Sequence, residues 1–152
     1  LKIFPKQAKK FIDQYFELYK NVKIYMERTV EDARAMGYSL TLMNRKRYLP
    51  DLNSKNRQAR EAAERIAINS PIQGSAADLI KLAMINLDRE ITQKKLNSRM
   101  ILQVHDELLF ECPSEEEEEM RALVKKEMEE VMPLKVPLVV DIGWGDNWND
   151  AH

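Results

Sequence analysis

The chain has 152 residues, enough for one ordinary domain with a core, and 44% of them are hydrophobic and 32% charged. This composition excludes the disordered and fibrous classes, and no apolar run approaches the roughly 20 residues of a membrane-spanning helix. The N-terminus lacks the zones of a secretion signal, and the single Cys112 cannot form an internal disulfide. We therefore expect a cytoplasmic protein.

The net charge of −1 does not by itself indicate a polyanionic partner. The charges are unevenly distributed, however. Residues 1–65 hold 15 Lys and Arg against 8 Asp and Glu, whereas residues 66–152 hold 9 against 17. A basic half of the sequence is followed by an acidic half.

Apolar residues at helical spacing predict a helix over residues 6–20 and a second over 22–35, which Gly37 ends. We expect the aromatic side chains of these helices to lie in the core. Alternation around Asn44 then predicts a short hairpin with a basic tip, Arg45-Lys46-Arg47. Such a tip can contact phosphates, but a short basic cluster alone favours a solvated loop.

A long helix is predicted over residues 58–95, and Pro71 should kink or split it. Two apolar runs within 99–112 predict a strand hairpin, residues 136–142 a third strand, and residues 115–131 a helix between them. This order of elements favours the α+β class, with an antiparallel sheet packed against long helices.

Five successive glutamates, residues 115–119, invite a metal-site hypothesis. Neighbouring helical positions point in different directions, so the five carboxylates cannot converge on one ion. Ser114 and Glu117 instead fit a capping box, and acids are favoured in the first turn of a helix. We interpret the run as structural.

Arg65, Asn69 and Gln73 are spaced by four, so they share one face of an unbroken helix. Arginine donates to phosphate, and amides donate and accept at base edges, which is typical of nucleic-acid binding. An alternative is equally open: Ser70 and Gln73 fit a capping box with Pro71 at the first helical position.

The sequence QVHDELLFE, residues 103–111, places His105, Asp106 and Glu107 between apolar runs. Such flanks predict strands that are covered on both faces or packed in a cleft. Adjacent carboxylates repel unless a cation or donors relieve them, so Asp106 and Glu107 are candidates for binding Mg²⁺, the ion of phosphoryl transfer. The alternative is an exposed turn whose acids are merely solvated.

Two long motifs, residues 45–85 (RKRYLPDLNSKNRQAREAAERIAINSPIQGSAADLIKLAMI) and 102–111 (LQVHDELLFE), resemble the C-terminal part of family A DNA polymerases of the bacterial type. Weaker agreement occurs at VPLVVDIGWGDNW, and the resemblance covers essentially the whole chain. It implies an antiparallel palm sheet. Residues 1–36 resemble the helical segment that follows the fingers helix, and residues 37–152 resemble the palm, with the kinked helix 58–95 and the catalytic hairpin 99–112.

The resemblance also implies roles for single residues. Asp106 corresponds to one of two aspartates that hold two Mg²⁺ ions, and Glu107 assists catalysis beside it. A further set corresponds to residues that contact the DNA, with Arg60 on the backbone and most of the others along the minor groove: Arg60, Arg65, Asn69, Gln73, Gln103 and His105.

The implied function is template-directed addition of deoxynucleotides to a primer 3′ end, in DNA replication and repair. The implied partners are primer-template DNA, a deoxynucleoside triphosphate and the N-terminal part of the polymerase. We find neither the family's other metal-binding aspartate nor its triphosphate-gripping helix in this sequence, so we expect the chain alone to be inactive. The competing hypothesis is a non-enzymatic nucleic-acid-binding module derived from a palm.

Overall fold

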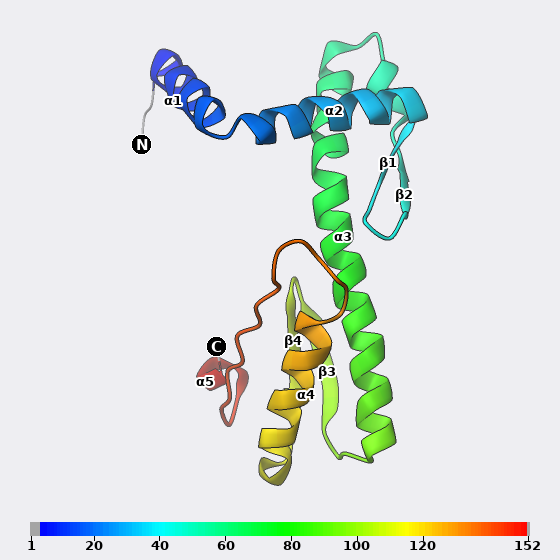
Figure 1. The fold of residues 1–152 in the computed structure, drawn as a ribbon, viewed down its shortest axis with the longest axis vertical. Coiled ribbons are helices and arrows are strands. Elements are labelled where there is room, and N and C mark those ends of the chain that lie inside the picture. Colours follow the sequence, from blue (N-terminus) through cyan, green and yellow to red (C-terminus); the bar gives the residue numbers. More distant parts are fainter. Residues whose placement is uncertain (1–3, 152) are drawn as a thin grey trace. The chain divides into compact units, whose positions relative to one another are not determined.

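The computed structural model describes residues 4–151, and Figure 1 shows their fold. Helices dominate, and the strands form two separate antiparallel hairpins, so the α+β prediction is confirmed. In chain order the elements are α1 (Pro5–Leu18), α2 (Lys20–Met36), β1 (Tyr38–Leu40), β2 (Lys46–Tyr48), η1 (Pro50–Asn53), α3 (Arg57–Lys94), β3 (Arg99–Val104), β4 (Glu107–Glu111), η2 (Ser114–Glu116), α4 (Glu117–Glu129) and α5 (Trp148–Ala151).

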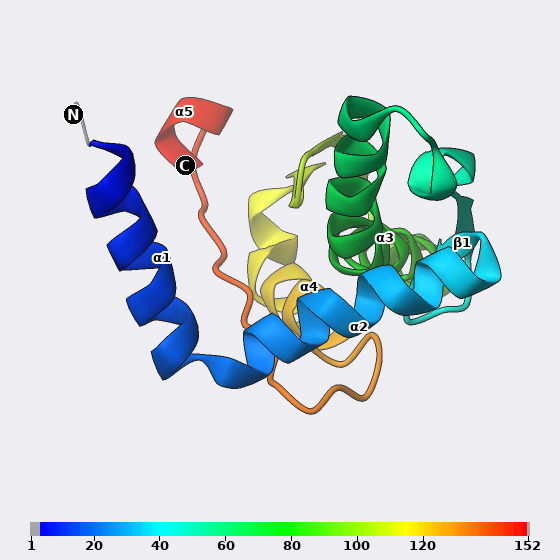
Figure 2. The same ribbon diagram turned by 90° about the horizontal axis from the view of Figure 1, so that it is seen from above.

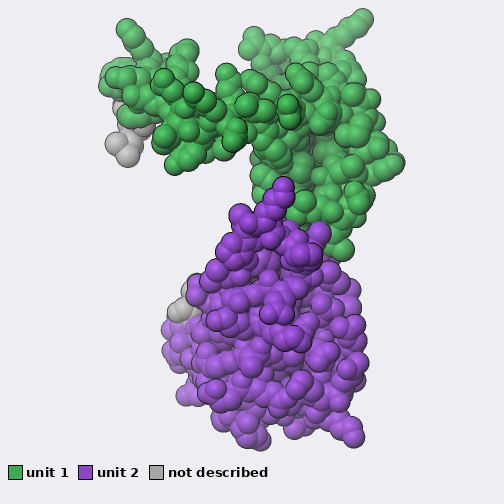
Figure 3. All heavy atoms as spheres, viewed as in Figure 1, with its two compact units in different colours: residues 1–75 green, residues 76–152 purple. Residues whose placement is uncertain are grey.

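The chain divides into two compact units, residues 1–75 and residues 76–152 (Figure 3). Helix α3 contributes residues to both. Each unit has a hydrophobic cluster of its own.

The first unit is built around small side chains of α3. Ala63 and Ala67 are buried against Ala33 of α2 and against Leu49 and Leu52, which flank and form η1. Alanine lets helices approach closely, and an ion pair between Arg34 and Glu64 adds to the contact of α2 with α3. Helix α2 ends at Gly37, whose φ of 80° only glycine adopts without strain, as predicted.

Helix α1 contributes nothing to a core. None of its residues is buried, and Phe11 is 63% exposed and Tyr15 49%. The prediction that the aromatic residues of α1 lie in the core is therefore wrong. Amphipathic spacing shows that a face can be buried, but it does not supply a partner for that face. Helix α1 leads into α2 (Figure 2), and Tyr19 lies between them. The rings of Tyr15 and Tyr19 pack on each other at 4.9 Å between centroids.

Helix α3 runs through Pro71 without a break. Of the two outcomes predicted at Pro71, a kink or a split, the split is wrong. The alternative of a capping box at Ser70 is also wrong, because no helix begins there. Proline removes one backbone hydrogen bond, a loss that buried residues on either side offset: Ala67 and Ser70 before it, Ser75 after it. The Ser75 hydroxyl also donates to the Pro71 carbonyl.

The hairpin of β1 and β2 is held against α3 at Gly74 and Ser75. The Leu42 amide donates to Ser75 Oγ at 2.8 Å, and the Arg45 guanidinium donates to the Gly74 carbonyl at 3.1 Å. The predicted turn near Asn44 is confirmed, and Asn44 has a φ of 61°. Arg45, at the predicted basic tip, thus anchors the hairpin to α3.

In the second unit β3 and β4 pair in an antiparallel hairpin beside α4 and the C-terminal part of α3 (Figure 1). Met100, Leu108 and Phe110 pack on the cluster of the second unit, which is formed by Leu87, Ile91, Met120, Leu123 and Val124. The prediction that both faces are covered is wrong for the described residues, because Ile101 is 56% exposed and Leu102 45%.

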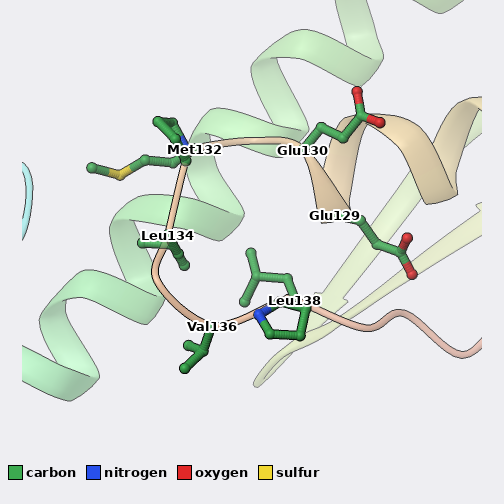
Figure 4. A pocket seen from close by; sticks show the side chains of 8 residues that line it. Glu129, Glu130, Met132, Leu134, Val136 and Leu138 are labelled. Carbon is green, nitrogen blue, oxygen red and sulfur yellow. The ribbon is translucent and has the colours of Figure 1, made fainter.

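No strand forms at residues 136–142, so the predicted third strand is wrong for the described part of the chain. Val136 and Val139 are both largely exposed. β-branched residues favour a strand only when a neighbouring strand accepts their backbone hydrogen bonds, and none lies along this segment. The Val140 amide instead donates to Glu129 Oε1 at 3.0 Å, which closes a loop around a cavity of about 350 Å³ (Figure 4).

Candidate functional site

The tip of the β3–β4 hairpin is a two-residue loop. Val104 and Glu107 are the last paired residues, which leaves His105 and Asp106 to make the turn. His105 has a φ of 53°, in the left-handed region that two-residue hairpin turns require and that histidine tolerates better than most residues. Gln103 Nε2 donates to the His105 carbonyl at 3.1 Å, which stabilises the turn. The backbone that carries Asp106 is thus held in place.

Asp106 and Glu107 are exposed and line a cavity of about 1060 Å³. Its walls are formed by β4 and the tip of the hairpin, by residues of α4, and by residues from 139 to 148 of the C-terminal segment. The tip is therefore not the covered turn that its flanking residues predict. Its carboxylates are instead accessible to a cation or to a phosphate-bearing ligand.

These carboxylates fit a Mg²⁺ site that is shared with other ligands. Magnesium prefers hard oxygen ligands and is commonly held by one or two carboxylates together with water and substrate phosphates. Among residues 4–151 no group of three or more His, Cys, Asp or Glu side chains forms a complete metal site. Asp106 and Glu107 are two carboxylates, which is the number of protein ligands that commonly holds Mg²⁺ together with water and phosphates.

In the first unit, Arg65, Asn69 and Gln73 lie four residues apart on the unbroken helix α3, and all three side chains are exposed. Continuity through Pro71 therefore places them on one face, as the spacing predicts for a binding surface. Arg60 differs from them. It is half-buried, and its guanidinium donates to the Ser54 carbonyl at 3.1 Å, so it also holds the segment that precedes α3.

The predicted site residues thus form two groups. The hairpin of the second unit brings Gln103, His105, Asp106 and Glu107 together, and α3 in the first unit brings Arg60, Arg65, Asn69 and Gln73 together.

The glutamate run serves several separate structural purposes. The prediction of a capping box formed by Ser114 and Glu117 is wrong, because α4 begins at Glu117 without a side-chain cap. Glu117 pairs with Arg121 at 2.8 Å, and Glu119 pairs with Lys94 at 2.7 Å. Sequence reasoning missed the role of Glu116, the buried member of the run.

Glu116 accepts hydrogen bonds from the loop that precedes β3. Its Oε1 accepts from the Asn97 amide at 2.7 Å, and its Oε2 accepts from the Ser98 amide at 2.9 Å and the Ser98 hydroxyl at 2.6 Å. These partners lie 18 and 19 residues away in sequence. No local pattern distinguishes Glu116 from its four acidic neighbours, so only the tertiary structure reveals this role.

We expect the stability of the chain to fall at acid pH partly through Glu116. The hydrogen bond from the Asn97 amide, followed by that from the Ser98 hydroxyl, lowers the pKa of Glu116 below its ordinary value of 4.5. A lowered pKa stabilises the fold fully above pH 4.5, and this contribution is lost as the pH falls through the lowered pKa. Urea unfolding between pH 7 and pH 3 should show a shallower pH dependence in Glu116→Gln than in the unaltered chain, whereas Glu118→Gln should keep the full dependence. Equal slopes for the unaltered chain and Glu116→Gln would contradict the assignment.

Arg121 holds the C-terminal segment against α4. Its Nη1 donates to the Ile142 carbonyl at 3.2 Å, and its guanidinium lies 5.5 Å from the centre of the Trp144 ring. A cation over an aromatic face is an attractive contact. Arg121 therefore holds Ile142 and Trp144, which line the same cavity as Asp106.

Comparison with known proteins gives one consistent result. The model of one family, DNA polymerase family A, matches residues 1–150. Over 151 residues, 99% of its length, the chain is 55% identical to DNA polymerase I of Caldicellulosiruptor bescii and 53% identical to that of Mycobacterium leprae. It spans only 18% and 17% of those two proteins.

The fold is similar to that of the POL domain of Pol1 from M. smegmatis, solved in complex with a DNA primer-template and dNTP. The TM-score is 0.96 at 51% identity, and the match covers 98% of this chain and 26% of that one. Across residues 4–151, each helix is too short or too polar to cross a lipid bilayer.

Proposed function

The chain belongs to DNA polymerase family A, and from this premise we propose that it supplies part of a site that adds deoxynucleotides to a primer 3′ end on a DNA template. Its partners are then primer-template DNA, a deoxynucleoside triphosphate and the rest of the polymerase, in the bacterial cytoplasm during replication and repair. We assign residues 37–152 to the palm of that polymerase and residues 1–36 to the segment after its fingers helix.

The observation that carries this proposal is the exposed acidic pair on a stabilised turn. Asp106 offers its carboxylate at a tip whose backbone is held by Gln103, and it opens onto a cavity large enough for a ligand. Asp106 acts as a Mg²⁺ ligand, and Glu107 assists beside it. Two bound Mg²⁺ ions would supply positive charge to the attacking 3′-hydroxyl oxygen and the leaving pyrophosphate oxygen.

The polar face of α3 binds the duplex in this proposal. Arg65, Asn69 and Gln73 lie along the minor groove, where the hydrogen-bond acceptors are similar for every correct base pair. Contacts of this kind test the geometry of a pair without reading its sequence. Gln103 and His105 contribute from the hairpin, and Arg60 contacts the backbone of the DNA.

We expect Gln73→Ala and Arg65→Ala to reduce turnover in the longest polymerase that contains this chain, and to weaken extension from mispaired primer ends further. Each removes hydrogen bonds worth about 1 kcal/mol, or roughly a 5- to 10-fold change in rate. The melting temperature should change little, because both side chains are exposed. Steady-state extension of matched and mispaired primers measures the effect.

Arg89→Ala, which alters another exposed arginine of α3, is the matched control and should leave both rates unchanged. A large fall in melting temperature with unchanged kinetics in Gln73→Ala or Arg65→Ala would show that these residues are structural.

The chain of 152 residues alone should not extend a primer in the presence of Mg²⁺ and all four deoxynucleoside triphosphates. Asp106 and Glu107 are too few to hold two metal ions, and we find no group in the sequence that corresponds to the family's triphosphate grip. Gel analysis of a labelled primer tests this expectation, with the longer polymerase as the positive control. Robust Mg²⁺-dependent extension by the chain alone would contradict it.

A further inference from the structure

The register of the β3–β4 hairpin changes within the hairpin. At its base Arg99 pairs with Glu111 and Met100 with Phe110, whereas beyond Ile101 the pairing shifts by one residue, so that Leu102 faces Leu109. Ile101 is therefore an extra residue in β3, a β-bulge.

The bulge determines the loop at the tip. If the register at the base continued unchanged, Gln103 would pair with Glu107, and Val104, His105 and Asp106 would form a three-residue loop. The observed shift instead pairs Val104 with Glu107 and leaves the two-residue turn. The two-residue turn and the register at the base are compatible only through the bulge at Ile101. Because a bulge bends its strand, the direction in which the hairpin carries Asp106 depends on the register at the base.

A buried polar cluster ties the two strands together at that base. Ser98 immediately precedes β3 and is 3% exposed, and Cys112 immediately follows β4, with its Sγ 3.0 Å from Ser98 Oγ. Glu116, 9% exposed, accepts the Ser98 hydroxyl and the amides of Ser98 and Asn97. We name Ser98, Cys112 and Glu116 the base cluster.

A slip of β3 by one residue would break this cluster. Ser98 would move away from both Cys112 and Glu116, and it would leave a buried carboxylate and backbone amides without partners. Buried charged groups without partners are strongly disfavoured, and more so than an altered bulge. The base cluster thus selects one register among those that the apolar strands tolerate.

We propose that the base cluster sets the register of β3 against β4 and thereby positions Asp106, which makes Glu116 a positioning residue for the acidic tip. The consequence for catalysis rests on the proposed polymerase function, whereas the register itself does not.

The register is tested by NMR on the chain of 152 residues, from close contacts between the backbone protons of paired residues. In the unaltered chain the contacts of the paired residues Arg99 and Glu111, next to the cluster, should be present. In Glu116→Gln and Ser98→Ala we expect them to weaken, with new contacts between Met100 and Glu111, the pairing that extends the register of the tip to the base. Glu118→Gln changes an exposed neighbour of Glu116 and should keep the original contacts. Original contacts in both folded cluster variants would overturn the proposal.

Kinetics of the longest polymerase that contains the chain provide the second test. We expect Glu116→Gln to lower kcat by roughly 10- to 100-fold at temperatures where circular dichroism shows a folded enzyme, with little change in the KM for the triphosphate, because a misplaced group costs rate more than binding. Glu118→Gln should leave kcat unchanged. Unchanged kcat in a folded Glu116→Gln enzyme with altered contacts at the base of the hairpin would overturn the positioning role. Absence of extension by the unaltered enzyme would instead refute the proposed function, and the NMR result would still decide the register.

Discussion

Asp106→Asn is expected to remove Mg²⁺-dependent primer extension from the longest polymerase that contains this chain, while binding of primer-template DNA is largely retained. Asparagine keeps the shape of the side chain but loses the charge that attracts a divalent cation. Loss of one group that stabilises charge in a reacting centre typically lowers kcat by on the order of 10²–10³-fold, and we expect at least that here. The exposed position of Asp106 on a two-residue turn predicts an unchanged melting temperature.

Single-turnover extension and a DNA-binding titration separate the two effects. The matched control is Glu111→Gln, an exposed acid at the other end of the same hairpin, which should retain full activity. Near-normal turnover in Asp106→Asn would refute the metal-binding role. The same result would favour the competing hypothesis of a nucleic-acid-binding module, in which the acidic tip is merely solvated.

Gly74→Ala is expected to destabilise the chain, although alanine normally stabilises a helix relative to glycine. A Cβ atom at Gly74 would lie 2.6 Å from Thr41 Cγ2, well inside van der Waals contact. Thr41 is buried, and its hydroxyl accepts the Arg45 amide at 3.1 Å, so its side chain cannot turn away without losing that bond. Overpacking of this kind costs about 1–3 kcal/mol, which exceeds the roughly 0.5–1 kcal/mol gained in helix propensity.

A double-mutant cycle with Thr41→Ser tests the close contact directly. Serine keeps the hydroxyl and removes the methyl group that the new Cβ would meet, so the double variant should be more stable than Gly74→Ala alone. Urea unfolding followed by circular dichroism should give a coupling energy of about 1 kcal/mol or more between the two positions. A Gly74→Ala chain that is more stable than the original, with no coupling to Thr41, would show that the hairpin of β1 and β2 does not pack closely on α3.

Sequence periodicity predicted α3 to within one residue at each end, because its apolar residues recur at helical spacing over its whole length. At Pro71 local propensity predicted a kink or a split, and the split does not occur. The helix continues there because buried neighbours on both sides outweigh one lost hydrogen bond. The sequence left open whether Gln73 caps a helix or belongs to a binding surface. Because the helix is continuous, Gln73 is an exposed residue on its polar face.

Two other differences between the predicted and the observed structure share one cause. The aromatic face of α1 and the β-branched segment 136–142 have the composition of buried elements, yet both are largely exposed. Composition records what a segment is suited to contact, whereas burial and strand pairing also require a partner in space. A pattern in one segment cannot reveal whether that partner is present.

The same distinction between local pattern and tertiary structure applies to the acidic tip of the β3–β4 hairpin. The sequence by itself determined the four longer helices, the two hairpins and the identity of the chemical groups at the turn, because these depend on local spacing and on residue type. Only the tertiary structure decided that Asp106 is exposed on a two-residue turn, and that Glu116 rather than any neighbouring glutamate binds the loop before β3. Those features depend on hydrogen bonds between residues far apart in the chain, which no local pattern encodes.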